Sequence, residues 1–280
     1  MSEGPKHSVD FTRHGKAKYA TYSEVQGSEN PRAQFDHENQ VAPDLTREGC
    51  ELAERSARAL LANFYVDEDV LFFASSNEVR AIETANIYRK VAHEMGIEIS
   101  RPKNVHSSLA EEVGEGEIRV VDSLSINAPD ILLGNVFSPD SHLESVNWDS
   151  VDDPDFLERW EKARKIINAN DKGSFGANFF EHSEAIKAIF PELQDAEDIY
   201  NQQFKNLIRL ARFGLKKANE SGHSKNVRIL AFGHENYMGW ALDKYFQDNE
   251  ITNCETVHIE VDEDERVHMT RRGQEQIISE

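Results

Sequence analysis

The sequence contains little cysteine and no long apolar segment. Its two cysteines, Cys50 and Cys254, are far apart and form no Cys-x-x-Cys spacing of the kind that binds zinc or carries out redox chemistry. We expect both to be free thiols in a reducing compartment. No stretch approaches the roughly 18 consecutive apolar residues of a membrane span, and the first residues, "MSEGPKHSVDF", lack the apolar region of a signal peptide. These absences predict a cytoplasmic protein without a membrane anchor.

Basic residues are scarce relative to acidic ones. The chain has 31 Lys and Arg against 51 Asp and Glu, which gives a formal net charge of −20. A protein with this charge repels nucleic acid phosphates and anionic membrane surfaces, so we expect neither as a partner. If the ligand is nevertheless an anion, its cationic contacts must be concentrated in one pocket.

The apolar residues predict an alternation of strands and helices. Strands are predicted at 8–12, 70–75 and 227–232, helices at 46–65, 78–95, 196–219 and 237–246, and a terminal hairpin at 254–270. Thr46 is the expected N-cap of the first helix. This alternation favours an α/β fold with three layers, α/β/α, around a mainly parallel sheet.

The length of 280 residues allows one domain with a large insertion or two small domains. We favour a single domain over residues 1–280. The segment at about 113–193 has many Asn and Asp and helical pieces near 156–168, and it predicts a helical insertion over the edge of the sheet.

Three segments place reactive or cationic side chains directly after a predicted strand. They are "TRHG", "SSNEVRAIETA" and "GHENY", and they contribute Arg13, His14, Arg80 and His234. In open α/β sheets, ligands bind outside the carboxyl ends of the strands, so these side chains are expected to meet in one crevice. Guanidinium groups match phosphate oxygens in a bidentate manner and stay charged at physiological pH. The sequence therefore predicts a phosphate-binding pocket.

These residues and their order resemble the histidine phosphatase superfamily, the phosphoglycerate mutase-like group of branch one. The resemblance rests on Arg13-His14-Gly15, on "LTREG", on "SS" followed by "RA" and "TA", on "SLAEE", and on "GH" at 233–234. It covers about residues 7–112 and 196–261 and leaves the insertion unmatched. A single Arg-His-Gly triplet is a weak signal, but five segments in order form a specific one. The resemblance implies a phosphoglycerate mutase-like fold.

The resemblance also implies a role for each matched residue. His14 is implied as the nucleophile that carries a transient phosphohistidine, while Arg13, Arg80 and His234 bind the phosphoryl oxygens. Chemistry agrees with this assignment, because an imidazole attacks only when neutral and neighbouring arginines lower its pKa. His234 is thus both a phosphate-binding and a catalytic residue, and neither a metal nor a cofactor is implied.

The proton donor is implied within "SSLAEEVGEGE". The family spacing of Leu, any residue and Glu selects Glu111, with Glu112 as the alternative. A carboxyl group beside a bound phosphate has a raised pKa, so it can protonate the leaving oxygen and then deprotonate water.

We therefore expect a metal-independent phosphatase that hydrolyses a phosphomonoester, either a small phosphorylated metabolite or a phosphoprotein. A phosphomutase of the phosphoglycerate mutase type is the first alternative; those enzymes typically follow the triplet with Glu or Gln, Ser and Asn, whereas this chain has Lys16-Ala17-Lys18-Tyr19. The Arg-His-Gly-x-Arg-x-Pro signature of the acid phosphatase and phytase branch does not occur. A non-catalytic scaffold that binds a phosphorylated ligand is the alternative from another class. The sequence leaves open the substrate, the oligomeric state and whether Lys16 contacts phosphate.

Five further histidines lack the spacing of metal ligands and are predicted to lie at the surface or in loops. They are His37, His106, His142, His182 and His258.

Overall fold

The computed structural model describes residues 7–17, 45–76, 79–99, 110–112, 118–120, 131–132, 155–167, 178, 180–189, 191, 196–212, 225–262 and 264–278. The strands of the main sheet are β1 (Ser8–Arg13), β2 (Asp69–Ser75), β3 (Glu98–Ile99), β6 (Ile131–Leu132), β7 (Asn226–Gly233), β8 (Thr256–Val261), β9 (Val267–Arg271) and β10 (Gln274–Ile278). A separate pair consists of β4 (Ala110–Glu112) and β5 (Ile118–Val120). The helices are α3 (Arg47–Leu61), α4 (Val79–Glu94), α6 (Phe156–Ile167), α8 (Ser183–Ile189), α9 (Ala196–Ile199), a π-helical segment (Tyr200–Phe204), a 3-10 turn (Glu235–Tyr237) and α11 (Gly239–Phe246).

The main sheet has a parallel centre and an antiparallel edge. Its strand order is β10-β9-β8-β1-β7-β2-β3, and β6 pairs with β2 off this path. The strands β1, β7, β2, β3 and β6 are parallel to one another, whereas β8, β9 and β10 are joined to the sheet by antiparallel pairing, β8 to β1. The predicted α/β fold and the predicted hairpin, β8–β9, are confirmed.

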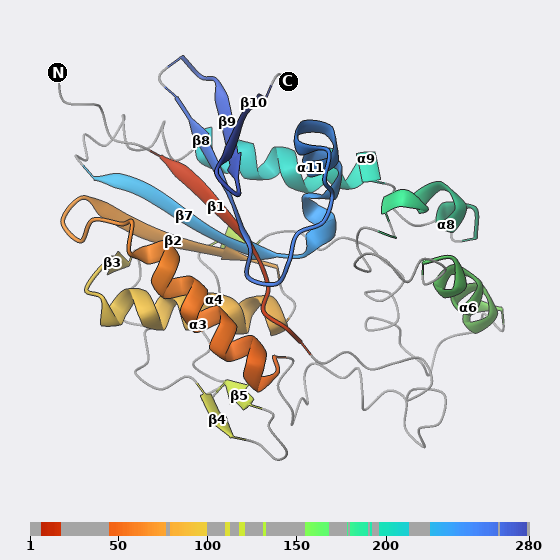
Figure 1. The fold of residues 1–280 in the computed structure, drawn as a ribbon, viewed down its shortest axis with the longest axis horizontal. Coiled ribbons are helices and arrows are strands. Elements are labelled where there is room, and N and C mark those ends of the chain that lie inside the picture. The colour runs from red at the N-terminus through yellow and green to blue at the C-terminus, as the bar shows by residue number, and fades with distance from the viewer. Residues whose placement is uncertain are drawn as a thin grey trace.

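Helices cover both faces of the sheet, which gives the three predicted layers. On one face α3 and α4 lie against β2 and β7, and the cluster includes Ala57, Leu61, Phe73 and Phe232 (Figure 1). On the other face the residues before and within α11 pack with the 196–212 helical segment onto β1, β7 and β8. Because both faces are covered, the central strand β1 is buried along almost its whole length, as parallel strands usually are.

The first helix begins as its sequence predicts. The Thr46 side chain accepts a hydrogen bond from the Gly49 amide at 3.1 Å, so the N-cap is confirmed. Its buried residues recur on one face, which is the face that packs on the sheet. None of the helices in the described ranges is both long and apolar enough to cross a membrane.

The last strand, β10, was not predicted. Four of its five residues are exposed, so it lacks the period-two pattern by which strands are found in a sequence. It is joined to β9 by Arg272 and Gly273, which have φ angles of 49° and 76°. Two successive positive φ angles are typical of the tight turn of a two-residue hairpin. The tight turn, and not an apolar side-chain pattern, therefore directs this strand back along β9.

Two features of the structure bear on the other sequence predictions. The helices α6 and α8 fall within the predicted insertion, and so does β6, which pairs in parallel with β2 at the edge of the sheet. His258, predicted to lie at the surface or in a loop, is in a strand and its side chain is 31% exposed. His258 lies in β8, and its Nδ1 is 2.7 Å from a carboxylate oxygen of Asp10 in the neighbouring strand β1. The two strands pair in register at these residues, which a search for loops and metal spacing does not detect.

Candidate active site

The carboxyl ends of three parallel strands lie level with one another. In the register of the sheet, Arg13 of β1 is opposite Gly233 of β7, and Phe232 of β7 is opposite Ser75 of β2. The chain continues in each case with a polar residue. The His14 amide donates to the Gly233 carbonyl at 3.0 Å, which ties the end of β1 to that of β7. The register thus places His14, His234 and Ser76 at one edge of the sheet, as the sequence predicts.

His14 is buried and has one of its ring nitrogens engaged. The residue is 2% exposed, and its Nδ1 is 2.7 Å from the backbone carbonyl oxygen of Gly15. A carbonyl oxygen can only accept, so Nδ1 carries the proton of the neutral ring and Nε2 carries the lone pair. Burial, Arg80 and, more weakly, Arg13 hold the pKa of His14 well below its ordinary value of 6.5, against the opposing effect of the Gly15 hydrogen bond. The ring is therefore neutral near neutral pH, with its lone pair on Nε2.

The turn after His14 packs against two helices. The Gly15 amide donates to the Thr84 hydroxyl at 3.0 Å, and that hydroxyl donates to the Arg80 carbonyl at 2.7 Å. At Gly49 an added Cβ would lie 2.1 Å from the Lys16 carbonyl oxygen. Glycine is needed here because the start of α3 approaches the backbone of the turn so closely. The contacts from Thr84 and Gly49 fix the backbone that carries His14.

His234 faces His14 across the edge of the sheet. The two ring centroids are 5.1 Å apart at an interplanar angle of 61°, and His234 also contacts the Tyr237 ring edge-on. The His234 Nε2 lies 3.0 Å from the Ser76 hydroxyl oxygen. Burial, Arg80, His14 and Arg13 lower the pKa of His234 well below its ordinary value. Ser76 was not assigned a role from the sequence, although "SS" after a strand was part of the motif.

Arg80 lies in the first turn of α4 and is 6% exposed. It lowers the pKa of both histidines, so its guanidinium charge acts on both rings. A buried cation at the positive end of a helix is electrostatically unfavourable by itself. The same charge would favour an anion bound near the two histidines.

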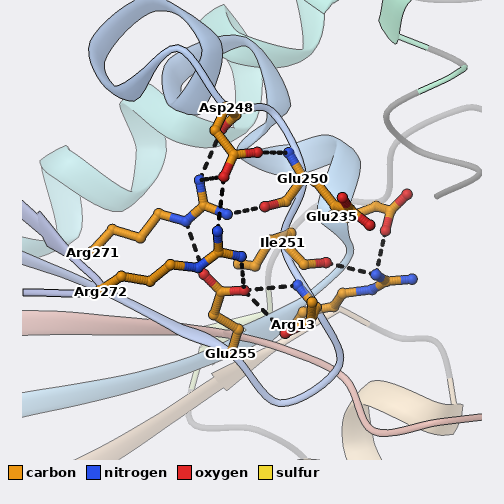
Figure 2. Close-up of polar contacts among 9 residues, drawn as sticks. Arg13, Glu235, Asp248, Glu250, Ile251, Glu255, Arg271 and Arg272 are labelled. Carbon is orange, nitrogen blue, oxygen red and sulfur yellow. Dashed lines mark hydrogen bonds and ion pairs between the residues drawn. The ribbon is translucent and has the colours of Figure 1, made fainter. Parts of the chain in front are cut away.

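Arg13 is the second guanidinium of the site, and it contacts two groups that the sequence did not predict. Its Nη1 forms an ion pair with the Glu235 carboxylate and donates to the Ile251 carbonyl oxygen at 2.6 Å (Figure 2). Glu235 is 8% exposed and directly follows His234. A carboxylate immediately after a predicted site histidine at a strand end is a signal that could have identified it. The structure thus places a buried carboxylate within the group of site residues.

The predicted acid lies elsewhere in the chain. Glu111 is in β4, where it is opposite Arg119 of β5, and Glu112 is the last residue of the same strand. The orientation of these side chains lies outside what the structure describes, so Glu111 as proton donor stays a prediction.

Lys16 forms an exposed ion pair with Glu48, with 2.6 Å between Nζ and the carboxylate oxygen. Within the described ranges, no group of three His, Cys, Asp or Glu residues is arranged to hold a metal ion.

No known family model and no curated protein matches the chain. Solved structures with similar backbones include a phosphoglycerate mutase from Bacillus anthracis strain Sterne, at 14% identity and a TM-score of 0.44, with 99% of this chain and 93% of that one covered. A phosphoserine phosphatase from Entamoeba histolytica has 12% identity, a TM-score of 0.37 and coverages of 97% and 95%. A multiple inositol polyphosphate phosphatase from Bifidobacterium longum has 13% identity, a TM-score of 0.39 and coverages of 99% and 88%. These three TM-scores are all below 0.5, so the similarity does not extend to the function of this chain.

Proposed function

We propose that this protein is a metal-independent histidine phosphatase that hydrolyses a phosphomonoester through a phosphohistidine on His14. The observation that supports this most directly is the state of His14. Its Nδ1 is engaged by the Gly15 carbonyl, its ring is kept neutral by burial and two arginines, and it lies at the sheet edge beside His234. A neutral imidazole whose Nε2 carries the lone pair, close to two arginines, suits attack on a phosphorus atom.

The reaction takes place in two displacements. In the first, His14 Nε2 forms a bond to phosphorus while the bond from phosphorus to the leaving oxygen breaks, and a carboxylic acid protonates that oxygen. In the second, the same carboxylate removes a proton from water, the water oxygen bonds to phosphorus, and the bond to His14 breaks. Arg13, Arg80 and His234 bind the oxygens of the transferred group and stabilise their charge in both transition states.

We propose Glu111 as the acid, following the motif, and the geometry adds Glu235 as a second candidate. Glu235 is buried beside His234 and forms an ion pair with Arg13. The ion pair favours the charged form of its carboxylate, whereas a proton donor must be protonated before it acts. We therefore assign Glu235 to holding Arg13 and keep Glu111 as the donor.

The substrate class is a small phosphorylated metabolite or a phosphoprotein. A phosphomutase would need the phosphoryl group to return to the substrate rather than to water. The segment after the triplet, Lys16-Ala17-Lys18-Tyr19, departs from the mutase pattern, which supports hydrolysis. A scaffold that has lost turnover would not need to keep both histidines and both arginines.

The test compares wild type with His14→Ala after treatment with a chelator, using p-nitrophenyl phosphate as substrate. We expect hydrolysis by wild type and a loss of at least about a thousandfold in the variant, the scale seen when a nucleophile is removed. His93→Ala serves as the matched control, because His93 is an exposed residue at the end of α4. Rapid quenching of the wild-type reaction should trap phosphate in an acid-labile, base-stable bond to the protein. Equal rates for wild type and His14→Ala would overturn the nucleophile assignment, and phosphate binding without turnover in wild type would favour the scaffold.

A further inference from the structure

The segment from Gln247 to Glu255 is here called loop 247–255. It contacts Arg13, the last residue of β1, and His14, which follows it. The Ile251 carbonyl accepts from the Arg13 guanidinium at 2.6 Å. The Asn253 side-chain amide donates to the His14 carbonyl at 2.9 Å, and the Cys254 amide donates to the Arg13 carbonyl at 3.0 Å. The Arg13 Nη1 is therefore held both by Glu235 and by this loop.

Loop 247–255 contains two residues with an unfavourable backbone conformation. Gln247 and Cys254 have φ angles of 56° and 58°, in the left-handed region that is unfavourable for residues other than glycine. Such residues each cost of order 1 kcal/mol and persist where surrounding contacts hold them. Besides its bonds to Arg13 and His14, the loop is held by contacts from the distant strand β9.

Arg271, the last residue of β9, supplies these contacts. Its Nη1 donates to the Asp248 carbonyl at 2.8 Å, its Nη2 donates to the Glu250 carbonyl, and its Nε donates to the Glu255 carboxylate at 2.8 Å (Figure 2). The Arg271 side chain is only 2% exposed. One planar guanidinium thus binds the loop at its beginning, its middle and its end, and Glu250 is the neighbour of Ile251, which accepts from Arg13. Hydrogen bonds from a buried charged group to several acceptors are among the stronger polar contacts in proteins.

The adjacent Arg272 offers a natural comparison. It forms ion pairs at 2.8 Å with the same two acidic side chains, Asp248 and Glu255, but it is 51% exposed and donates to neither carbonyl. Burial by itself would raise the pKa of Glu255, yet hydrogen bonds from Arg272, the Thr252 amide and Arg271 lower it to about 2. Glu255 is consequently ionised at physiological pH, and both arginines face a charged carboxylate. The two residues differ in burial and in contact with the loop backbone.

We infer that Arg271 is a positioning residue for phosphoryl transfer: by holding the backbone of loop 247–255 it fixes the Ile251 carbonyl, and through it the Arg13 guanidinium, at the phosphate site. This inference rests on the proposed function. Arg271 contacts no reacting group itself. It acts at a distance, because the Arg13 guanidinium binds phosphate only in the orientation that its two acceptors, Glu235 and the Ile251 carbonyl, impose. Misplacement of a binding group by about 1 Å can lower the rate by up to about a hundredfold.

The experiment compares Arg271→Met and Arg271→Lys with Arg272→Met in hydrolysis of p-nitrophenyl phosphate and in inhibition by inorganic phosphate. We expect Arg271→Met to lower kcat/KM by about ten- to a hundredfold and to weaken phosphate inhibition. Arg272→Met should change neither by more than about threefold, as is usual for exposed ion pairs. Circular dichroism and thermal melting establish that each variant is folded. If Arg271→Met does not fold, Arg271→Lys carries the test, because lysine keeps the charge beside Glu255 but cannot reach all three acceptors at once.

A double-mutant cycle with Arg13→Met separates positioning from a general structural role. If Arg271 acts through Arg13, the loss caused by Arg271→Met should shrink to less than about threefold once Arg13 is already replaced. An equal loss in both backgrounds, or equal effects of Arg271→Met and Arg272→Met, would overturn the inference while leaving the proposed function intact. A wild-type protein that neither hydrolyses the aryl phosphate nor binds phosphate would overturn the proposed function and this inference together.

Discussion

The imidazole of His14 meets that of His234 edge to face, with 5.1 Å between the ring centroids. The two residues follow β1 and β7, which are adjacent in the sheet but lie near opposite ends of the chain. Burial and Arg80 lower the pKa of both rings, so the pair is neutral in the absence of an anion. A neutral His14 beside His234 is the arrangement that the proposed phosphoryl transfer needs.

The acid limb of the pH profile should lie below the ordinary histidine range. Burial and Arg80 lower the pKa of His14, so the ring stays neutral as the pH falls through 6.5 and attack on phosphorus continues. In Arg80→Met the loss of this charge should move the acid limb of kcat/KM to higher pH. The measurement is kcat/KM for one aryl phosphate between about pH 4 and 8, so that ionisation of the substrate is common to both proteins. An acid limb that stays in place in the variant would contradict the proposed influence of Arg80.

Three glutamine substitutions should separate the roles of the candidate carboxylates. We expect Glu111→Gln to lower kcat/KM by about a hundredfold or more with a poor leaving group such as an alkyl phosphate, and little with p-nitrophenyl phosphate, because kcat/KM reports the first displacement, in which the acid protonates the leaving oxygen. Glu235→Gln should raise KM for both substrates to a similar extent, because it releases Arg13 from its ion pair. Glu112→Gln is the matched control. A leaving-group dependence in Glu235→Gln and none in Glu111→Gln would transfer the acid role to Glu235.

Alanine at Gly49 should damage both stability and activity. Its Cβ would lie 2.1 Å from the Lys16 carbonyl oxygen, so α3 or the turn after His14 must move. Forcing atoms into a packed site costs typically about 1–3 kcal/mol, and we expect a loss of unfolding free energy at the upper end of this range, together with lower kcat/KM. Gly239→Ala is the control, because the nearest atom to its added Cβ is 3.8 Å away. Urea unfolding of both variants measures the difference, and a stable, fully active Gly49→Ala would show that the close approach is not required.

The ion pair between His258 and Asp10 should make stability depend on pH. Burial lowers the pKa of His258, but hydrogen bonds to Asp10 and Glu260 outweigh it and raise the pKa to about 9. A raised pKa in the folded state means that the stabilisation is complete below the unfolded value of about 6.5 and disappears as the pH rises through about 9.

The measurement is the free energy of unfolding in urea at pH 6, 7.5 and 9 for wild type and His258→Gln. The stability advantage of wild type should shrink steadily across this series. Taking the difference between the two proteins removes the contribution of other groups that titrate in the same range. An advantage that is constant with pH would mean that His258 is not charged in the folded protein.

The sequence predicted the parts of this protein that depend on neighbours along the chain. Buried strands, the Thr46 cap and the polar residues that follow the strands are local patterns, and the sequence therefore identified Arg13, His14, Arg80 and His234. Parallel pairing then brings strand ends together by a general rule of α/β sheets, so even their convergence was predictable.

Contacts between distant segments were decided only by the tertiary structure. The ion pair of Arg13 with Glu235 depends on the register of β1 with β7. The hydrogen bonds from Arg271 to loop 247–255 depend on the register of β8 with β9. An exposed strand such as β10 leaves no apolar pattern, and an arginine looks the same in the sequence whether it is buried or solvated. The sequence by itself determined which groups could carry out the chemistry, whereas folding determined which other groups hold them in place, because hydrogen-bond partners are chosen by proximity in space.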